Sequence, residues 1–248
     1  MFCRRQLPCL CHAPAVLVFC TALWLTGCAT SSSLSSSKRP DAGSAYTRLG
    51  LAYLEQNNLQ RALNALDRAE QLNPDSPETL QALALVYQRQ GEDDLAARQF
   101  QQALEADADF TRARNNYAAF LYQQGQYQRA CEQLKIAAQD TKYAHRARLF
   151  TNLGQCYAAL DQIQRARDSF IRAGEINPRQ ARSHWLLARL EFSQGHHDRA
   201  WSALQRFLQL GRPTQKALEM AVELARERGD TRLAERYRRR LDGTGEAP

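Results

Sequence analysis

The side chains with the widest chemical range in this 248-residue sequence belong to its seven cysteines and five histidines. A thiolate or an imidazole can bind a metal ion, attack a carbonyl group or move a proton when partner residues stand at suitable spacing. No histidine has a cysteine or acidic residue at the spacing of a metal site or a catalytic triad; the five are His12, His145, His184, His196 and His197. The sequence also lacks a phosphate-binding glycine loop and a nucleophile motif. We therefore expect a protein that is not an enzyme and that holds no metal ion or cofactor.

Five of the cysteines lie within the first 28 residues, in a segment with the features of a secretory signal. Arg4 and Arg5 form a positively charged region, and an apolar run of eleven residues extends from Ala15 to Leu25. Eleven residues are too few to cross a bilayer as a helix. At the end of this run, residues 25–28 read Leu-Thr-Gly-Cys and resemble a bacterial lipobox.

The lipobox resemblance implies a lipidated protein. A signal peptidase would remove residues 1–27, and the Cys28 thiol would carry a diacylglycerol. Acyl chains contribute about 0.8 kcal/mol per buried methylene group, so a multiply acylated N-terminus is held on a bilayer. Ala29 stands where the inner-membrane retention signal has aspartate, which implies the periplasmic side of the outer membrane. The alternative is an ordinary signal peptide followed by an incidental cysteine.

Residues 28–42 are expected to form a flexible tether, because this serine-rich segment carries almost nothing to bury. Beyond it, only Cys131 and Cys156 remain as thiols, in what we expect to be an oxidising compartment. They lie on predicted neighbouring helices and so could form a disulfide. Two buried, unpaired cysteines are the simpler interpretation, and we favour it.

The overall composition is that of a globular protein. Apolar residues make up 44% and charged residues 24%, which argues against a wholly disordered chain. A multi-pass membrane protein is excluded because the eleven residues 15–25 are the only apolar run that could enter a bilayer. The formal net charge of +7 is spread along the chain and not gathered in one block. Export and lipid anchoring argue against a nucleic-acid partner.

A period of 34 residues organises the rest of the sequence. Six alanines recur with spacings of 34, 34, 36, 34 and 34: Ala62, Ala96, Ala130, Ala166, Ala200 and Ala234. A second series has the same spacings: Asn57, Gly91, Gly125, Asp161, Gly195 and Gly229. Residues of this second kind tolerate the left-handed backbone that ends one helix and turns into the next.

This period and its residues resemble the tetratricopeptide repeat family. The first repeat shows the pattern in full, with Leu49-Gly50, Tyr53, Ala62, Leu66, Ala69 and Pro74. The fifth repeat departs from the pattern, with Glu191 where an aromatic residue is usual. The resemblance implies an all-α, right-handed α-solenoid of about six repeats over residues 43–242, with a tail at 243–248. Each repeat is a helix pair that buries its apolar stripe by stacking on its neighbours.

In such a solenoid the first helix of each repeat lines the inner surface, where a partner would bind. Counting along the family pattern gives the expected partner-binding residues, which are Leu51, Leu54, Gln81, Leu85, Gln88, Asn115, Tyr122, Arg148 and Trp185. Leucines exposed in a groove indicate that an apolar segment of another protein binds there, because such a segment would remove them from water. The alternative is that some of these leucines belong to the core.

One stretch carries a more specific resemblance. Residues 115–122 read Asn-Asn-Tyr-Ala-Ala-Phe-Leu-Tyr, residues 139–143 read Gln-Asp-Thr-Lys-Tyr, and the two-residue insertion in the period lies around His145 and Arg146. With the lipobox and six repeats, these elements resemble the type IV pilus biogenesis lipoproteins, the pilotin family. The resemblance implies an outer-membrane lipoprotein that binds the pilus secretin subunit and promotes its localisation and multimerisation, with no small-molecule substrate.

A second functional class is a general envelope scaffold, which would serve outer-membrane protein assembly or the regulation of peptidoglycan enzymes. Such proteins share a lipobox and repeats, but we know of no reason for them to share the elements at 115–122 and 139–143. A hydrolase with accessory repeats is excluded, because the repeats leave no residues for a catalytic domain.

Overall fold

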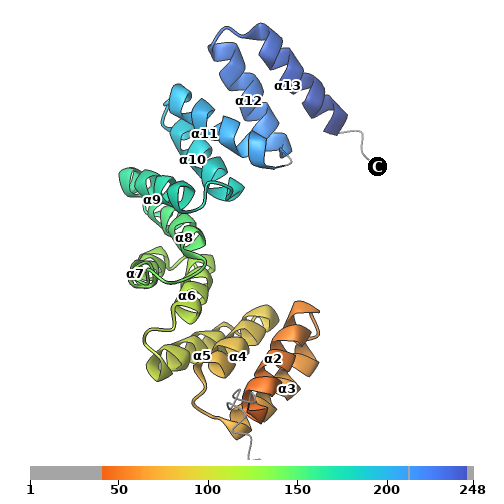
Figure 1. The fold of residues 1–248 in the computed structure, drawn as a ribbon, viewed down its shortest axis with the longest axis vertical. Coiled ribbons are helices and arrows are strands. Elements are labelled where there is room, and N and C mark those ends of the chain that lie inside the picture. Colours follow the sequence, from red (N-terminus) through yellow and green to blue (C-terminus); the bar gives the residue numbers. More distant parts are fainter. Residues whose placement is uncertain (1–40, 212, 245–248) are drawn as a thin grey trace, which may run out of the picture. The chain divides into compact units, whose positions relative to one another are not determined.

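The computed structural model describes residues 41–211 and 213–244 (Figure 1). The expected signal segment 1–27, the lipidation site Cys28, and residues 28–40 of the expected tether lie outside these residues. So do residues 245–248 of the expected tail. Within the described ranges the chain forms twelve helices and no strand, which confirms the predicted all-α class. No helix in these ranges has the length and apolar content that crossing a bilayer demands.

The helices follow one another as six pairs. They are α2 (Ala42–Glu55) and α3 (Leu59–Leu72), α4 (Pro77–Gln90) and α5 (Asp93–Ala106), α6 (Thr111–Gln123) and α7 (Tyr127–Ala137), α8 (Arg146–Ala159) and α9 (Ile163–Ile176), α10 (Ala181–Ser193) and α11 (His197–Leu210), α12 (Gln215–Glu227) and α13 (Thr231–Thr244).

The turn inside each pair contains one residue with positive φ, and these are the six residues of the second predicted series. Four are glycines, with φ between 71° and 80°. Asn57 and Asp161 adopt φ values of 57° and 55°, which their short polar side chains tolerate better than most others. The predicted turns are therefore confirmed.

The two helices of a pair approach closely where the first helix carries a small residue. A Cβ atom added to Gly50 would lie 2.5 Å from Cγ of Leu66, so α2 and α3 touch there without room for a side chain. The periodic alanines of the second helices are also packing positions. Five of the six are fully buried, and Ala234 in the last helix is 4% exposed.

Successive pairs stack through two kinds of contact. Each second helix packs against the first helix of the next pair, as α3 does on α4 and α9 on α10. First helices also contact one another directly, from α2 to α10. The first helices therefore form a continuous surface of their own, which we call the first-helix face (α2, α4, α6, α8, α10 and α12).

The connection between the third and fourth pairs is longer than the others. Eight residues, 138–145, separate α7 from α8, whereas four residues, 73–76, separate α3 from α4. Helix α7 is also shorter, with 11 residues against 14 in most of the others. The inserted residues thus lengthen one loop and leave the stacking of helices unchanged.

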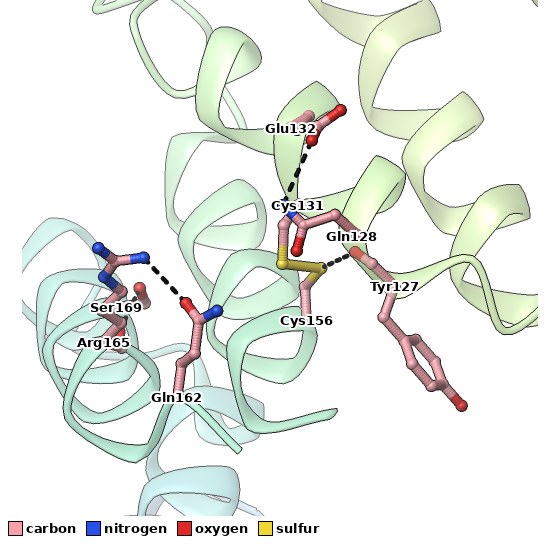
Figure 2. The surroundings of a disulfide bond; sticks show 8 residues. All are labelled: Tyr127, Gln128, Cys131, Glu132, Cys156, Gln162, Arg165 and Ser169. Atoms are coloured by element: carbon pink, nitrogen blue, oxygen red, sulfur yellow. Dashed lines mark hydrogen bonds between the residues drawn. A yellow bond between two sulfur atoms is a disulfide. The ribbon is translucent and has the colours of Figure 1, made fainter. Parts of the chain in front are cut away.

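A disulfide joins the two helices on either side of this long connection, which corrects the favoured interpretation of two free thiols. Cys131 of α7 and Cys156 of α8 are bonded, with their Cα atoms 5.6 Å apart (Figure 2). Both residues are buried, and Sγ of Cys156 lies 3.1 Å from the carbonyl oxygen of Tyr127. The bond ties α7 to α8 across the loop that the insertion lengthened.

Candidate protein-binding surface

The first-helix face is built from rows of equivalent residues. Because the repeats are 34 or 36 residues apart, each inward position of α2 recurs once in every following first helix. The row that contains Leu51 continues with Leu85, Ala119, Gln155, Arg189 and Glu223. This row is therefore apolar in the first three repeats and polar or charged in the last three.

Six of the nine predicted partner-binding residues are accessible on this face. Arg148 is exposed, and the other five are half-buried: Leu51, Leu85, Gln88, Tyr122 and Trp185. Gln88 donates a hydrogen bond from Nε2 to Oε1 of Gln123 at 2.6 Å, which links α4 to α6. These side chains present both apolar and hydrogen-bonding groups to a partner.

The other three predicted residues are buried, and the prediction that they are exposed is wrong. Leu54, Gln81 and Asn115 are only 7%, 4% and 9% exposed. The reason is the direct contact between successive first helices, which encloses these positions. Asn152 of α8, for example, donates a hydrogen bond from Nδ2 to Oδ1 of Asn115 in α6 at 3.0 Å. These residues hold neighbouring repeats together.

The C-terminal part of the face has aromatic and cationic groups beside a hollow. A cavity of about 390 Å³ is lined by side chains that include Tyr122, Gln155, Leu186 and Arg189. The guanidinium of Arg189 lies over the ring of Trp185, 6.0 Å from its centroid. Such a combination can hold a polypeptide by stacking and by hydrogen bonds at once.

The N-terminal helix exposes an apolar stripe that sequence analysis missed. Tyr46 and Leu49 of α2 are 37% and 41% exposed. Their equivalents one repeat later, Leu80 and Leu83, are 6% and 1% exposed. Leu83 clusters with residues of the preceding repeat, Leu54 and Leu66, whereas Leu80 clusters with Ala103 of α5 and Ala113 of α6. The exposure of Leu49 follows from the repeat register, since within the described chain the first repeat has no preceding repeat to cover it.

Sequence analysis also missed a charged cluster at the junction of α9, α10 and α11. The carboxylate of Glu191 is almost fully buried and accepts hydrogen bonds from Arg167, at 3.2 Å for Nη2. Nδ1 of His196 lies 2.9 Å from Oε2 of Glu191, so this histidine has an acidic partner that sequence spacing did not reveal. Burial raises the pKa of Glu191, but hydrogen bonds and charge from Arg167 and His196 outweigh it and hold the pKa below its ordinary value.

A groove of about 780 Å³ lies beside this cluster, between α9 and α11. Ile171 and Leu187 give it an apolar floor, while Arg199 and Arg206 stand along it. The described residues contain no group of three or more histidine, cysteine, aspartate or glutamate side chains that could hold a metal ion.

Comparisons with known sequences agree with the repeat architecture. A family described as TPR repeat matches residues 50–91, and one described as tetratricopeptide repeat matches residues 82–145 and 145–214. The chain is 34% identical over 227 residues to the type IV pilus assembly protein PilF of Pseudomonas aeruginosa, and the match covers 90% of each chain.

Solved structures give the same relationship. The structure of Pseudomonas aeruginosa PilF is 32% identical, with a TM-score of 0.76, over 82% of this chain and 91% of PilF. PilW, described as a widely conserved type IV pilus biogenesis factor, is 20% identical with a TM-score of 0.74, over 84% and 96% of the two chains. The similarity to PilW shows a shared fold, which is the predicted α-solenoid.

Proposed function

Because this chain belongs to the tetratricopeptide repeat proteins and is a relative of PilF, we propose that it is an assembly factor of the type IV pilus. The observation that carries the proposal is the 34% identity that extends over 90% of both chains. In finer detail, we propose a pilotin: a non-enzymatic lipoprotein that binds the pilus secretin and promotes its localisation and multimerisation. It would act by contact alone.

The proposed location is the periplasmic side of the outer membrane, with Cys28 carrying the lipid. The lipobox-like residues 25–28 support it. The disulfide between Cys131 and Cys156 supports export as well, because disulfides persist in the periplasm and are rare in reducing compartments. A tether of about a dozen residues would then keep the repeats close to the membrane surface.

The first-helix face is the proposed binding surface for the secretin. Its accessible leucines, Leu51 and Leu85, lie in the first two repeats, which follow the proposed anchor most closely in the sequence. A preformed groove binds a segment of another chain without losing conformational entropy of its own, because its helices are already ordered. Membrane anchoring raises the local concentration of the groove near the site of secretin assembly.

Deletion of the gene tests the proposal. We expect loss of heat-resistant secretin multimers on immunoblots and loss of surface pili, both restored by the wild-type gene. Replacement of Cys28 by alanine should abolish incorporation of radiolabelled palmitate and leave the secretin outside the outer-membrane fraction. Normal secretin multimers in the deletion strain would contradict the pilotin role. Co-purification with a barrel-insertion complex, in place of the secretin, would favour the envelope-scaffold function.

A further inference from the structure

We propose that the C-terminal half of the first-helix face docks an acidic, extended segment of the partner protein through a row of four cationic side chains. This cationic row consists of Arg112, Arg148, Arg182 and Lys216. The inference rests on the proposed function, since it states the chemistry of the segment that the assembly factor would hold. It concerns the third to sixth repeats and is separate from the apolar leucines of the first two.

The four residues occupy one equivalent position in successive repeats. The separations are 148 − 112 = 36, 182 − 148 = 34 and 216 − 182 = 34, the same spacings as those of the repeats. Each residue lies in the first turn of its helix, α6, α8, α10 or α12, and each is exposed. The first two repeats have Ser44 and Glu78 at this position, so the row begins only at the third repeat.

The positive charge of the three arginines of the row is not balanced within the helices that carry them. Helices α6, α8 and α10 together contain six arginines and one acidic residue, Glu191, which is buried and paired with Arg167. Helix α12 differs, because it carries Glu219, Glu223 and Glu227 beside Lys216 and Arg226. Among the described residues, no ion pair includes a member of the row. The nearby carboxylate of Asp140 accepts hydrogen bonds from Thr111 at 2.6 Å and from the backbone of Lys142 at 2.9 Å.

Helix stability does not explain these cations. A positive charge in the first turn opposes the helix dipole and costs roughly 0.3–1 kcal/mol at an exposed site. Helix α4 shows the favourable arrangement, with Ser76 as N-cap and Glu78 in the first turn. Three consecutive first helices, α6, α8 and α10, have neither an N-cap side chain bond nor a first-turn acid. An acidic ligand gives these positions the charge partner that the chain does not.

Side chains between the cations make the surface suitable for a polypeptide. Burial raises the pKa of Tyr143, and the positive charges of Arg112 and Arg148 act against that rise. Arg182 donates a hydrogen bond from Nη2 to Oε1 of Gln155 at 2.8 Å, which is a neutral partner. An aromatic side chain, Tyr143, and an amide side chain, Gln155, therefore accompany the arginines of the row.

The spacing of the row predicts the spacing of acids in its ligand. Axes of packed helices are about 8–10 Å apart. An extended chain advances about 3.3 Å per residue, so three residues cover one step of the row. We therefore expect aspartate or glutamate at every third residue of the bound segment.

Fluorescence anisotropy with labelled peptides tests this inference on the purified full chain. One 12-residue peptide carries glutamate at every third position, and its isomer carries the same four glutamates in one block. We expect the spaced peptide to bind several-fold more tightly than the block isomer, and binding to weaken in high salt. Equal affinity for the two isomers would overturn the predicted spacing.

A triple variant, R112E/R148E/R182E, tests the row itself. It should stay folded, because acids in the first turn suit the helix dipole, and circular dichroism verifies this. We expect its affinity for the spaced peptide to fall about tenfold or more. The matched control, R98E/R232E/R236E, makes the same charge change at exposed residues of α5 and α13 and should change the affinity less than twofold. Equal losses in the two variants would overturn the inference.

Three further outcomes separate this inference from its alternatives. If the row variant loses binding to phosphatidylglycerol vesicles while peptide binding is unchanged, the row serves a membrane and the inference is wrong. If gene deletion leaves secretin multimers intact while the row still selects the spaced peptide, the proposed function fails and this inference stands. If multimers require the gene but the row variant binds the peptide normally, this inference alone fails.

Discussion

Glu191 of α10 and Arg167 of α9 form a buried ion pair across the junction of the fourth and fifth repeats, with side chains 2% and 11% exposed. The same two positions recur at each junction, one in the second helix of a repeat and one in the first helix of the next repeat. In the first junction the equivalent residues are Tyr87 and Leu63, which pack in the same apolar cluster. The fourth junction has therefore replaced an apolar contact with a matched pair of charges.

Removing one member of this pair should be costly. Glu191→Gln leaves the buried Arg167 guanidinium without its charge partner, and we expect a loss of about 3 kcal/mol of stability. We compare the urea concentrations at the unfolding midpoint of the two proteins. A free energy extrapolated from a single two-state transition is avoided, because arrays of repeats need not unfold in one step. An unchanged midpoint would show that the ion pair contributes nothing.

The repeat register supplies a rescue for this variant. Glu191→Tyr combined with Arg167→Leu reproduces the residues of the first junction, Tyr87 and Leu63. We expect this double variant to regain most of the stability that either single variant loses, since replacing a buried ion pair by packed apolar groups is often neutral. Additive losses in the double variant would contradict a direct contact.

The same pair predicts a dependence on pH. Burial raises the pKa of Glu191, but the bonds and charges of Arg167 and His196 lower it more, so the folded value lies below the ordinary 4.5. The pair's contribution is therefore complete above the pKa of the unfolded chain and is lost as pH falls through the lower folded value. Wild type should exceed Glu191→Gln in stability at about pH 5 and lose that advantage as the pH falls below the ordinary pKa of glutamate, through the lower folded value. A gap that widens with acidification would reverse the assigned direction.

The disulfide should be a major source of stability for the middle of the stack. Cys131 and Cys156 are 25 residues apart, and closing a loop of this length constrains the unfolded chain by about 3.5 kcal/mol in the entropic treatment. We expect the double variant C131S/C156S to melt well below wild type in calorimetry. Reductant should lower the melting temperature of wild type only. The same melting curve with and without the bond would contradict this role.

Two neighbouring leucines of α2 should respond differently to truncation. Leu54 is 7% exposed and packs in a core cluster with Leu83 and Val86, so Leu54→Ala should cost about 2–4 kcal/mol. Leu51 is half-buried at the surface of the same cluster, and Leu51→Ala should cost clearly less. Chemical denaturation of the two variants compares them directly. Equal costs would mean that Leu51 belongs to the core as well.

The periodic residues made most of the fold predictable. The six turn residues with positive φ and the six periodic alanines of the second helices form two series that sequence spacing defines. The insertion near His145 likewise marked the one long connection. These features are local, because the same helix pair is repeated and its internal contacts recur at fixed separations.

Contacts between repeats were less predictable. Leu54, Gln81 and Asn115 share the inward side of their helices with accessible residues, and only the approach of neighbouring first helices decides which of them are enclosed. Arg167 and Glu191 are 24 residues apart and belong to different repeats, so neither carries a local signal. The repeat pattern had marked Glu191 as a departure, and aligning the second helices would have marked Arg167 as well, since each is charged at a mostly apolar repeat position.

Crosslinking in living cells tests the central claim, that the first-helix face binds the secretin. A photo-crosslinking amino acid is placed at Leu85 on this face, and at Arg98, an exposed residue of α5, as the control. We predict an adduct with the secretin subunit from position 85 and none from position 98. An adduct from position 98 alone, or adducts at 85 only with a different protein, would contradict the proposed binding surface.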